Sequence, residues 1–339
     1  MGTYQKVIDK NLDAKKAEQH RQELIKKIEA ATERRLLVYV ADIKKPQSSL
    51  TLEDKTGFSD LIDGVEVDGV DVLVNSPGGF AEVAESIVEM LRAKYKSIRF
   101  LVPNAAKSAA TLMVLSGDEI LMDHRSELGP IDPQVQYTTK DGLKQEAAEA
   151  IIVGFEAAKE ALSKSDPAAI RAYVPLLEKY TIGLLQGCQN AIELSKTLAE
   201  TWLRTYMFDG DEKAKEPTNA AAYLGSHKLT LSHSRPITID KCKKLNLKIV
   251  DLREAKYRDL QQLLWELWCM YELHFERTPI TKVYENSSGT LLQKVQAQII
   301  VQQVNPGLPQ IPQIPIPKQT PPGPLPGLPG GGGLRPKKT

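Results

Sequence analysis

The chain has 339 residues, of which 42% are hydrophobic and 26% are charged, and its formal net charge is +1. These values are typical of a globular protein with a sizeable core, and they exclude a strongly basic, nucleic-acid-binding composition. The three cysteines (Cys188, Cys242 and Cys269) match no metal or redox spacing. We therefore expect reduced thiols, a cytoplasmic location, and no metal or cofactor. The sequence shows neither the apolar core of a signal peptide nor a run of 18 apolar residues, so we expect no membrane-spanning segment.

The first 34 residues are rich in lysine and glutamate around an interrupted apolar stripe. They predict one charged helix over about 4–34 that packs on the core or on a neighbour. Because its acidic residues cancel the field of its lysines, we do not expect this helix to bind nucleic acid.

A strand–turn–helix pattern repeats over residues 36–122. Strands alternating with helices at these lengths predict a largely parallel sheet in an α/β fold. The predicted strands are 36–40, 70–75, 96–102 and 119–122, and the predicted helices are 54–62, 80–94 and 108–116.

Helical periodicity dominates after Gln134. The apolar periodicity over residues of about 146 to 207 predicts a helical insertion that covers the sheet. Such an insertion could serve as a lid or form subunit contacts. Beyond it we expect a strand at 247–251 and helices at 219–224, 238–245 and 258–275.

The end of the chain has a different composition. From Asn305 onward it is dominated by proline and glycine, with a basic end, and such a segment cannot bury enough apolar surface to become ordered. We expect a disordered tail, and a docking partner for it is an open alternative. The predicted domains are a charged helix (1–34), an α/β domain (35–290) and an extension (291–339).

Two predicted strand ends carry residues suited to nucleophilic catalysis. The sequence N-S-P-G-G at 75–79 ends one strand, and its paired glycines allow positive φ and a close approach of backbone N–H groups to a ligand. Ser108 follows the next strand and opens a helix, a position from which its hydroxyl can point into a cleft. A serine nucleophile also needs a base and oxyanion donors. The candidate donors are the backbone N–H groups of Gly78, Gly79 and Ala109.

Three motifs in order carry a family resemblance: N-S-P-G-G at 75–79, A-K-S-A-A at 106–110 and L-G-P-I-D-P-Q at 128–134. Together they resemble the serine dehydrogenase proteinase family of the Clp protease/crotonase superfamily, which is related to signal peptide peptidase A. The resemblance covers roughly residues 36–289. It implies repeated ββα units, a serine endopeptidase that acts on peptide or protein substrates, and assembly as a homo-oligomer. No G-x-x-x-x-G-K-[ST] motif occurs, so we expect hydrolysis to be independent of ATP.

The resemblance implies a catalytic Ser, Asp, His order, which Ser108, Asp132 and His233 match. In that triad His233 takes the Ser108 proton while Asp132 holds the His233 tautomer. His124 is the second candidate histidine and His227 the third.

A Ser–Lys dyad is the rival mechanism, because a buried lysine can act as a general base. Lys144 and Lys159 stand at dyad-like spacing after Ser108. Two other functions also stay open at this point: a catalytically silent oligomeric scaffold of the same fold, and crotonase-like acyl-CoA chemistry, which requires no serine nucleophile. The serine in A-K-S-A-A favours the peptidase.

Overall fold

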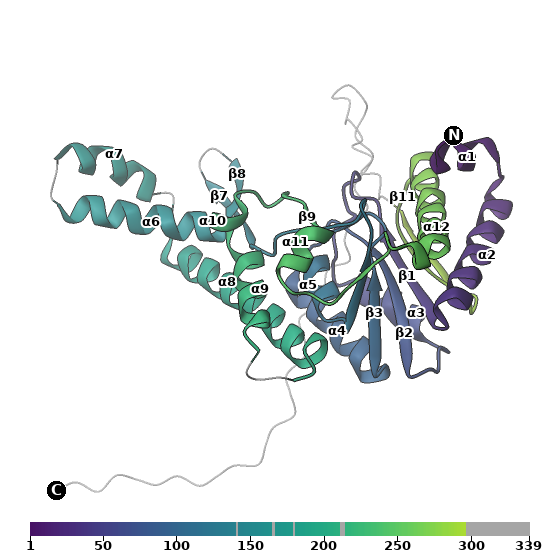
Figure 1. The fold of residues 1–339 in the computed structure, drawn as a ribbon. Helices are drawn as coiled ribbons and strands as arrows, with labels where there is room; N and C mark the ends of the chain where they lie inside the picture. The colour runs from purple at the N-terminus through teal and green to yellow at the C-terminus, as the bar shows by residue number, and fades with distance from the viewer. Residues whose placement is uncertain (140–141, 165–166, 179, 211–213, 296–339) are drawn as a thin grey trace, which may run out of the picture. The chain divides into compact units, whose positions relative to one another are not determined.

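Seven strands form the central sheet, in the order β10-β5-β3-β2-β1-β11-β12. Figure 1 shows this sheet with helices on both of its sides. The computed structural model describes residues 1–295 apart from 140–141, 165–166, 179 and 211–213, so the tail predicted from residue 305 lies outside the described residues. Five strands pair in parallel, whereas β11 is antiparallel to both of its neighbours. The strands are β1 (Arg35–Ala41), β2 (Gly69–Asn75), β3 (Ser97–Leu101), β5 (Glu119–Met122), β10 (Ile249–Asp251), β11 (Ile280–Asn286) and β12 (Leu291–Val295).

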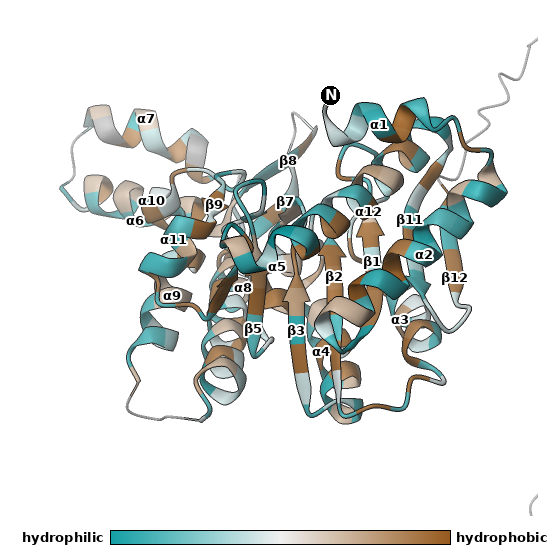
Figure 2. Ribbon diagram, turned by 45° about the vertical axis from the view of Figure 1, so that its right-hand side comes forward, coloured by the Kyte–Doolittle hydropathy of each residue, from teal (hydrophilic) through white to brown (hydrophobic). Residues whose placement is uncertain are grey.

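Helices cover both faces of this sheet, which explains why its parallel strands are continuous apolar runs. Leu37 and Tyr39 of β1 pack in the core beneath α3 (Asp54–Ile62), α4 (Ala81–Lys94) and α5 (Ala109–Leu115). Leu36 and Val38 alternate with them and pack on the opposite side, beneath α2 (Ala14–Thr32) and α12 (Arg258–Arg277). Figure 2 shows the result as hydrophobic strands between helices that carry hydrophilic residues.

A second, three-stranded sheet lies at the carboxyl ends of the central strands. It consists of β4 (Ala105–Ala106), β6 (Glu127–Leu128) and β9 (Ile237–Thr238). The long strand β3 is followed by the short strand β4 and then by α5, and β5 is followed by β6. This repetition of a long and a short strand confirms the predicted Clp/crotonase-like α/β class, with a largely parallel sheet.

The region after Gln134 is helical, as predicted, but it begins with a hairpin that the sequence analysis did not predict. Strands β7 (Gln134–Thr139) and β8 (Gly142–Ala147) pair antiparallel before the first helix. Helix α8 then packs on α4 and α5, so the insertion covers the helical layer of the sheet. The helices of this part are α6 (Ala148–Ser163), α7 (Pro167–Leu177), α8 (Ile182–Trp202), a π-helix (Leu203–Met207), α9 (Glu216–Gly225), α10 (His227–Thr230) and α11 (Ile239–Lys244).

The amino-terminal segment forms two helices rather than the single helix that we predicted. Helix α1 (Thr3–Asp9) ends before Asn11, which has a φ of 42°. Asp13 then caps α2 by accepting a 2.8 Å hydrogen bond from the Lys16 N–H. Both α1 and α2 contact α12, so the charged segment packs on the core through its apolar stripe.

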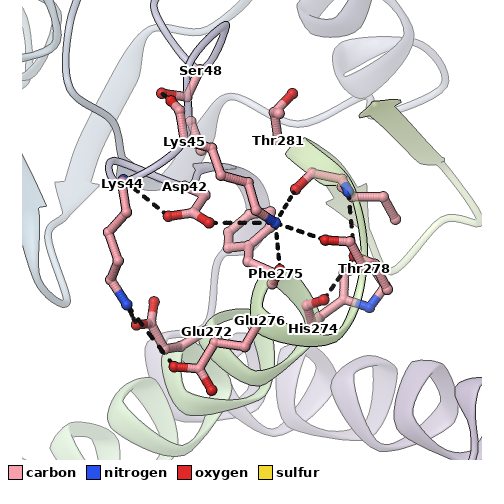
Figure 3. Close-up of polar contacts among 12 residues, drawn as sticks. Asp42, Lys44, Lys45, Ser48, Glu272, His274, Phe275, Glu276, Thr278 and Thr281 are labelled. Carbon is pink, nitrogen blue, oxygen red and sulfur yellow. Dashed lines mark hydrogen bonds and ion pairs between the residues drawn. The ribbon is translucent and has the colours of Figure 1, made fainter. Parts of the chain in front are cut away.

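A lysine holds together the end of β1, the end of α12 and the start of β11 (Figure 3). The Lys45 ammonium donates hydrogen bonds to the carbonyl oxygens of Phe275, Thr278 (2.7 Å) and Ile280 (3.0 Å). The last carbonyls of an α-helix have no partner within the helix, and Lys45 supplies one from outside it. Asp42, 3.5 Å from the same ammonium, partly balances its charge.

Among the residues that the structure describes, no helix combines the length and the apolar character that crossing a membrane requires.

Candidate active site

Ser108 occupies a strained turn between a strand and a helix. Its backbone has φ 52° and ψ −122°, although it is not a glycine, and it lies between β4 and the first residue of α5. The turn is fixed on both sides, because the Lys107 N–H donates to the Ser76 carbonyl (3.0 Å) and the Ala110 N–H donates to the Lys107 carbonyl (2.9 Å). Non-glycine residues at such angles cost free energy and concentrate at functional sites, and a serine between strand and helix presents its Oγ outward.

Two glycines bring a neighbouring backbone loop against this turn. A Cβ on Gly78, whose φ is 86°, would lie 2.3 Å from the Lys107 carbonyl oxygen, and a Cβ on Gly79 would lie 2.2 Å from the Leu50 carbonyl oxygen. Leu50 clamps the loop through its own backbone, since its N–H donates to the Gly78 carbonyl (2.6 Å) and its carbonyl accepts from the Phe80 N–H (3.1 Å). Only residues without a side chain fit these two positions.

The three predicted oxyanion donors differ in their hydrogen bonding. The Gly78 N–H donates to Ser76 Oγ at 3.2 Å. Within the described part of the chain, the N–H groups of Gly79 and Ala109 have no hydrogen-bond partner. Gly79 and Ala109 are therefore the two that can donate to a bound group beside Ser108.

Asp132 is buried beneath two histidines. Its side chain is only 1% exposed, and its Oδ1 lies 2.8 Å from Nδ1 of His233. Its Oδ2 lies 2.9 Å from Nδ1 of His227 and accepts a 3.0 Å hydrogen bond from Gln134 Nε2. Carboxylate oxygens accept hydrogen bonds, so both histidines face Asp132 with Nδ1 as the donor, and among the described residues neither Nε2 has a hydrogen-bond partner.

Ser108 and His233 line one cleft of about 680 Å³. Within the described residues, no hydrogen bond joins Ser108 Oγ to His233, and such bonds are often long or poorly aligned before substrate binds. The other walls are mainly apolar and backbone surface, with Phe80 exposed at the edge. Among the lining residues are Gly78, Gly79, Ala109, Leu112, Ile131, Pro133, Gln134, Leu194 and Ser195.

The remaining candidates lie elsewhere. His124 is exposed and does not line the cleft, and the same holds for Lys144 on β8. Lys159 forms an ion pair with Glu156 on the solvent side of α6, with 67% of its side chain exposed. Lys107, next to the serine, forms an ion pair with Glu127. None of these lysines is a desolvated partner of Ser108.

Three contacts at this site did not emerge from the sequence. The contact between His227 and Asp132 joins residues 95 positions apart. The clamp by Leu50 comes from a loop with no recognisable pattern. Gln134 stands in the L-G-P-I-D-P-Q motif, and a polar side chain two residues after the acid was the available signal.

Comparison with known protein families identifies the family of the chain. A family model described as ClpP-like SDH-type serine proteinase matches residues 51–268, more than half of the chain. The chain belongs to this family. The match includes the Gly78–Gly79 loop, the Ser108 turn, Asp132 and both histidines. Membership in this serine proteinase family supports a serine peptidase in general terms.

Two curated relatives are uncharacterized proteins of Methanocaldococcus jannaschii. MJ0137 is 32% identical over 177 residues, which is 49% of this chain and 58% of the relative. MJ1495 is 28% identical over 195 residues, which is 57% of this chain and 56% of the relative. The chain thus spans little more than half the length of these relatives.

A solved structure of the 1510-N membrane-bound stomatin-specific protease also matches. It is 15% identical, with a TM-score of 0.39, over 67% of this chain and 84% of the solved chain.

Proposed function

We propose that the protein is a serine endopeptidase that hydrolyses peptide bonds through an acyl-enzyme on Ser108. The observation that carries the proposal is the strained Ser108 turn, which shares a cleft with His233, a histidine held by buried Asp132. This combination supplies a nucleophile and an oriented base in one site. Because β-turns and helix caps need no such histidine–carboxylate pair, catalysis explains the arrangement better than local structure does.

In the proposed reaction, Ser108 Oγ attacks the carbonyl carbon of a peptide bond as His233 Nε2 takes the hydroxyl proton. Asp132 keeps the Nδ1–H tautomer and stabilises the imidazolium that forms. The N–H groups of Gly79 and Ala109 donate to the oxyanion of the tetrahedral intermediate. The intermediate expels the amine, which receives the proton from His233. Water then attacks the acyl-enzyme, with His233 again as the base, and releases the carboxylic acid and Ser108.

The substrate, location and assembly belong to the same proposal. The mainly apolar walls of the cleft suit extended peptide segments with apolar side chains. We propose that hydrolysis requires neither ATP nor a metal or other cofactor, that the enzyme acts in the cytoplasm, and that it forms a homo-oligomer.

The experiment is hydrolysis of an unfolded protein and of fluorogenic peptides at several pH values. Ser108→Ala and His233→Ala should each lower kcat/KM by at least about 10²–10³-fold while the circular dichroism spectrum stays unchanged. Lys144→Met and Lys159→Met are the matched controls and should stay within a few-fold of the wild type. If one lysine variant is inactive and His233→Ala is active, the base is a lysine. If Ser108→Ala retains full activity, the proposal fails.

A further inference from the structure

We propose that the buried ion pair of Lys282 and Asp54 positions the Gly78–Gly79 loop by holding the clamp segment, residues 49–54, against it. Both members of the pair are positioning residues, because neither lines the cleft of Ser108. The catalytic consequence rests on the proposed function. The positioning itself rests on backbone contacts that can be measured without any substrate.

The Lys282 ammonium ties down both ends of the clamp segment. It donates to the Ser49 carbonyl at 2.7 Å and to the two carboxylate oxygens of Asp54 at 3.0 and 2.7 Å. The Asp54 carboxylate also accepts from the Thr51 N–H at 2.6 Å. Leu50, which is fully buried, therefore lies between two residues whose backbone groups are bound to the pair.

Leu50 passes this constraint on to the loop beside Ser108. Its N–H donates to the Gly78 carbonyl at 2.6 Å, and its carbonyl accepts from the Phe80 N–H at 3.1 Å. These two bonds lie on either side of Gly79, whose N–H is one of the two proposed oxyanion donors. If the clamp segment shifts, this donor shifts with it, and a misplacement of about 1 Å can lower a rate about 100-fold.

The surroundings of the pair suit positioning better than stabilisation. Its side chains are 5% and 0% exposed. The hydroxyls of Tyr39 and Tyr284 also donate to Asp54, and burial raises the pKa of both tyrosines, which keeps them protonated. Because the cost of removing two charges from water offsets most of their attraction, a buried ion pair contributes little net stability. Its hydrogen bonds to Ser49 and Thr51 nevertheless fix where the clamp segment lies.

The residues before the clamp segment are anchored independently of the pair. Ser48 Oγ donates to the Lys45 carbonyl at 2.8 Å, and the Lys45 side chain binds the end of α12 (Figure 3). Loss of the Lys282–Asp54 pair should therefore release the clamp segment and leave residues 45–48 in place.

The kinetic test removes both charges together, so that neither stays buried without a partner. Lys282→Met/Asp54→Asn should lower kcat by about 10–100-fold, because a displaced oxyanion donor no longer stabilises the transition state. KM should stay within about three-fold of the wild type, since the walls of the cleft are unchanged.

The matched control is Arg21→Met/Glu285→Gln. Arg21 and Glu285 form an equally buried pair at 2.8 Å, and Glu285 lies on β11 like Lys282. Glu285 accepts its other hydrogen bonds from Gln22 and Tyr271 instead of from the clamp segment. The control should keep kcat within about three-fold of the wild type. Equal losses of kcat in the two double variants would show a general effect of stability and would overturn the proposal.

Hydrogen exchange measures the clamp directly. In the full chain with Ser108→Ala, peptides containing Leu50 and Phe80 should exchange at least about tenfold faster when Lys282→Met/Asp54→Asn is added. The same peptides should be unaffected by Arg21→Met/Glu285→Gln. Unchanged exchange in the variant without the Lys282–Asp54 pair would overturn the proposal.

A single substitution keeps the test available if the double variant does not fold. Asp54→Asn retains an acceptor for the Thr51 N–H but loses the charge, so the changes in kcat and in exchange should be smaller, about 3–10-fold. Glu285→Gln is its matched control and should change neither quantity.

The two measurements separate this inference from the proposed function. Faster exchange at the clamp segment, in a chain whose wild type shows no hydrolysis, would retain the positioning and reject the peptidase. Hydrolysis that depends on Ser108 and His233, with kcat and exchange unchanged by loss of the pair, would reject the positioning and retain the peptidase.

Discussion

Gly79 gives the most direct residue-level prediction, because the structure leaves no room for a side chain there. In Gly79→Ala the new Cβ would lie 2.2 Å from the Leu50 carbonyl, so the loop must move and its free N–H loses its place beside Ser108. Losing one oxyanion donor typically lowers kcat by about 10²–10³-fold, and we expect a loss of that size. Steady-state kinetics of a variant with native circular dichroism measure it.

Gly64→Ala is the control for Gly79→Ala. Gly64 also has a positive φ, 68°, but open space surrounds its Cβ position. The Gly64→Ala variant should lose about 1 kcal/mol of stability and keep its activity. Equal kinetic losses in both variants would show that the effect is conformational strain and not the oxyanion contact.

The lowered pKa of His274 predicts how the stability of the folded chain depends on pH. Burial, with further contributions from the charges of Arg21 and Lys45, lowers the pKa of His274 from 6.5 to about 4. Between these two values the unfolded chain binds more protons than the folded chain, so this group's contribution to stability is present above about pH 6.5 and is lost as the pH falls toward 4. Because His274 is only partly buried, we expect about 1–2 kcal/mol.

Urea unfolding of the wild type and of His274→Gln, at pH 7.5 and pH 4.5, measures this contribution. The wild type should lose about 1–2 kcal/mol more than the variant between the two pH values. An identical loss in both proteins would show that other groups cause the acid sensitivity.

At the level of elements, Lys45 predicts how strongly α12 is anchored to the sheet. Lys45→Met leaves the carbonyls of Phe275, Thr278 and Ile280 without that donor. Buried groups that lose a charged partner typically cost about 1–3 kcal/mol, and urea unfolding should show a loss in this range. Because Lys45 does not line the Ser108 cleft, kcat/KM should not change.

The neighbouring lysine provides a matched control for the Lys45 variant. The Lys44 side chain is 67% exposed and pairs with Glu272. Exposed ion pairs contribute little, so Lys44→Met should change stability by less than about 0.5–1 kcal/mol. If the two variants lose equal stability, the carbonyl contacts of Lys45 are not what anchors α12.

The elements also show what could be predicted from the sequence. The strands β1, β2, β3 and β5 were predicted because buried parallel strands are continuous apolar runs. Strand β11 was missed because it contains Lys282 and Glu285, which look like surface residues. In the fold, Lys282 pairs with Asp54 at 2.7 Å and Glu285 pairs with Arg21 at 2.8 Å, and all four are buried. Partners so distant in the chain give no local signal.

The β7–β8 hairpin was missed for a different reason. Its sequences, Q-V-Q-Y-T-T and G-L-K-Q-E-A, are mostly polar, and most of their side chains are exposed or half-buried. The only alternation in the hairpin is that of Val135 and Tyr137 in β7, which pack against the small core of the insertion, and two apolar residues are too short a pattern to indicate a strand. Within the site, the turns at Ser108 and Gly79 could be predicted from the glycines and small residues that follow the strands. The position of His227 could not, because it depends on how α10 packs.

At the scale of the whole molecule, we predict self-association. Several large apolar side chains of the helical insertion are exposed, among them Val153 (58%), Ile170 (42%) and Ile182 (88%). Burial of these side chains between subunits would favour association. Light scattering at micromolar concentration should give a mass that is a multiple of the 37.6 kDa chain. A monomer under these conditions would contradict the predicted homo-oligomer.

The proposed role of Ser108 as an activated nucleophile can be tested by covalent labelling with a fluorophosphonate, followed by intact mass measurement and peptide mapping. Mapping is needed because Ser49 and Ser195 line the same cleft. We predict one label per chain, on Ser108, that disappears in Ser108→Ala and forms at least about 100-fold more slowly in His233→Ala. Labelling at Ser49 or Ser195, or no labelling of the folded wild type, would contradict it.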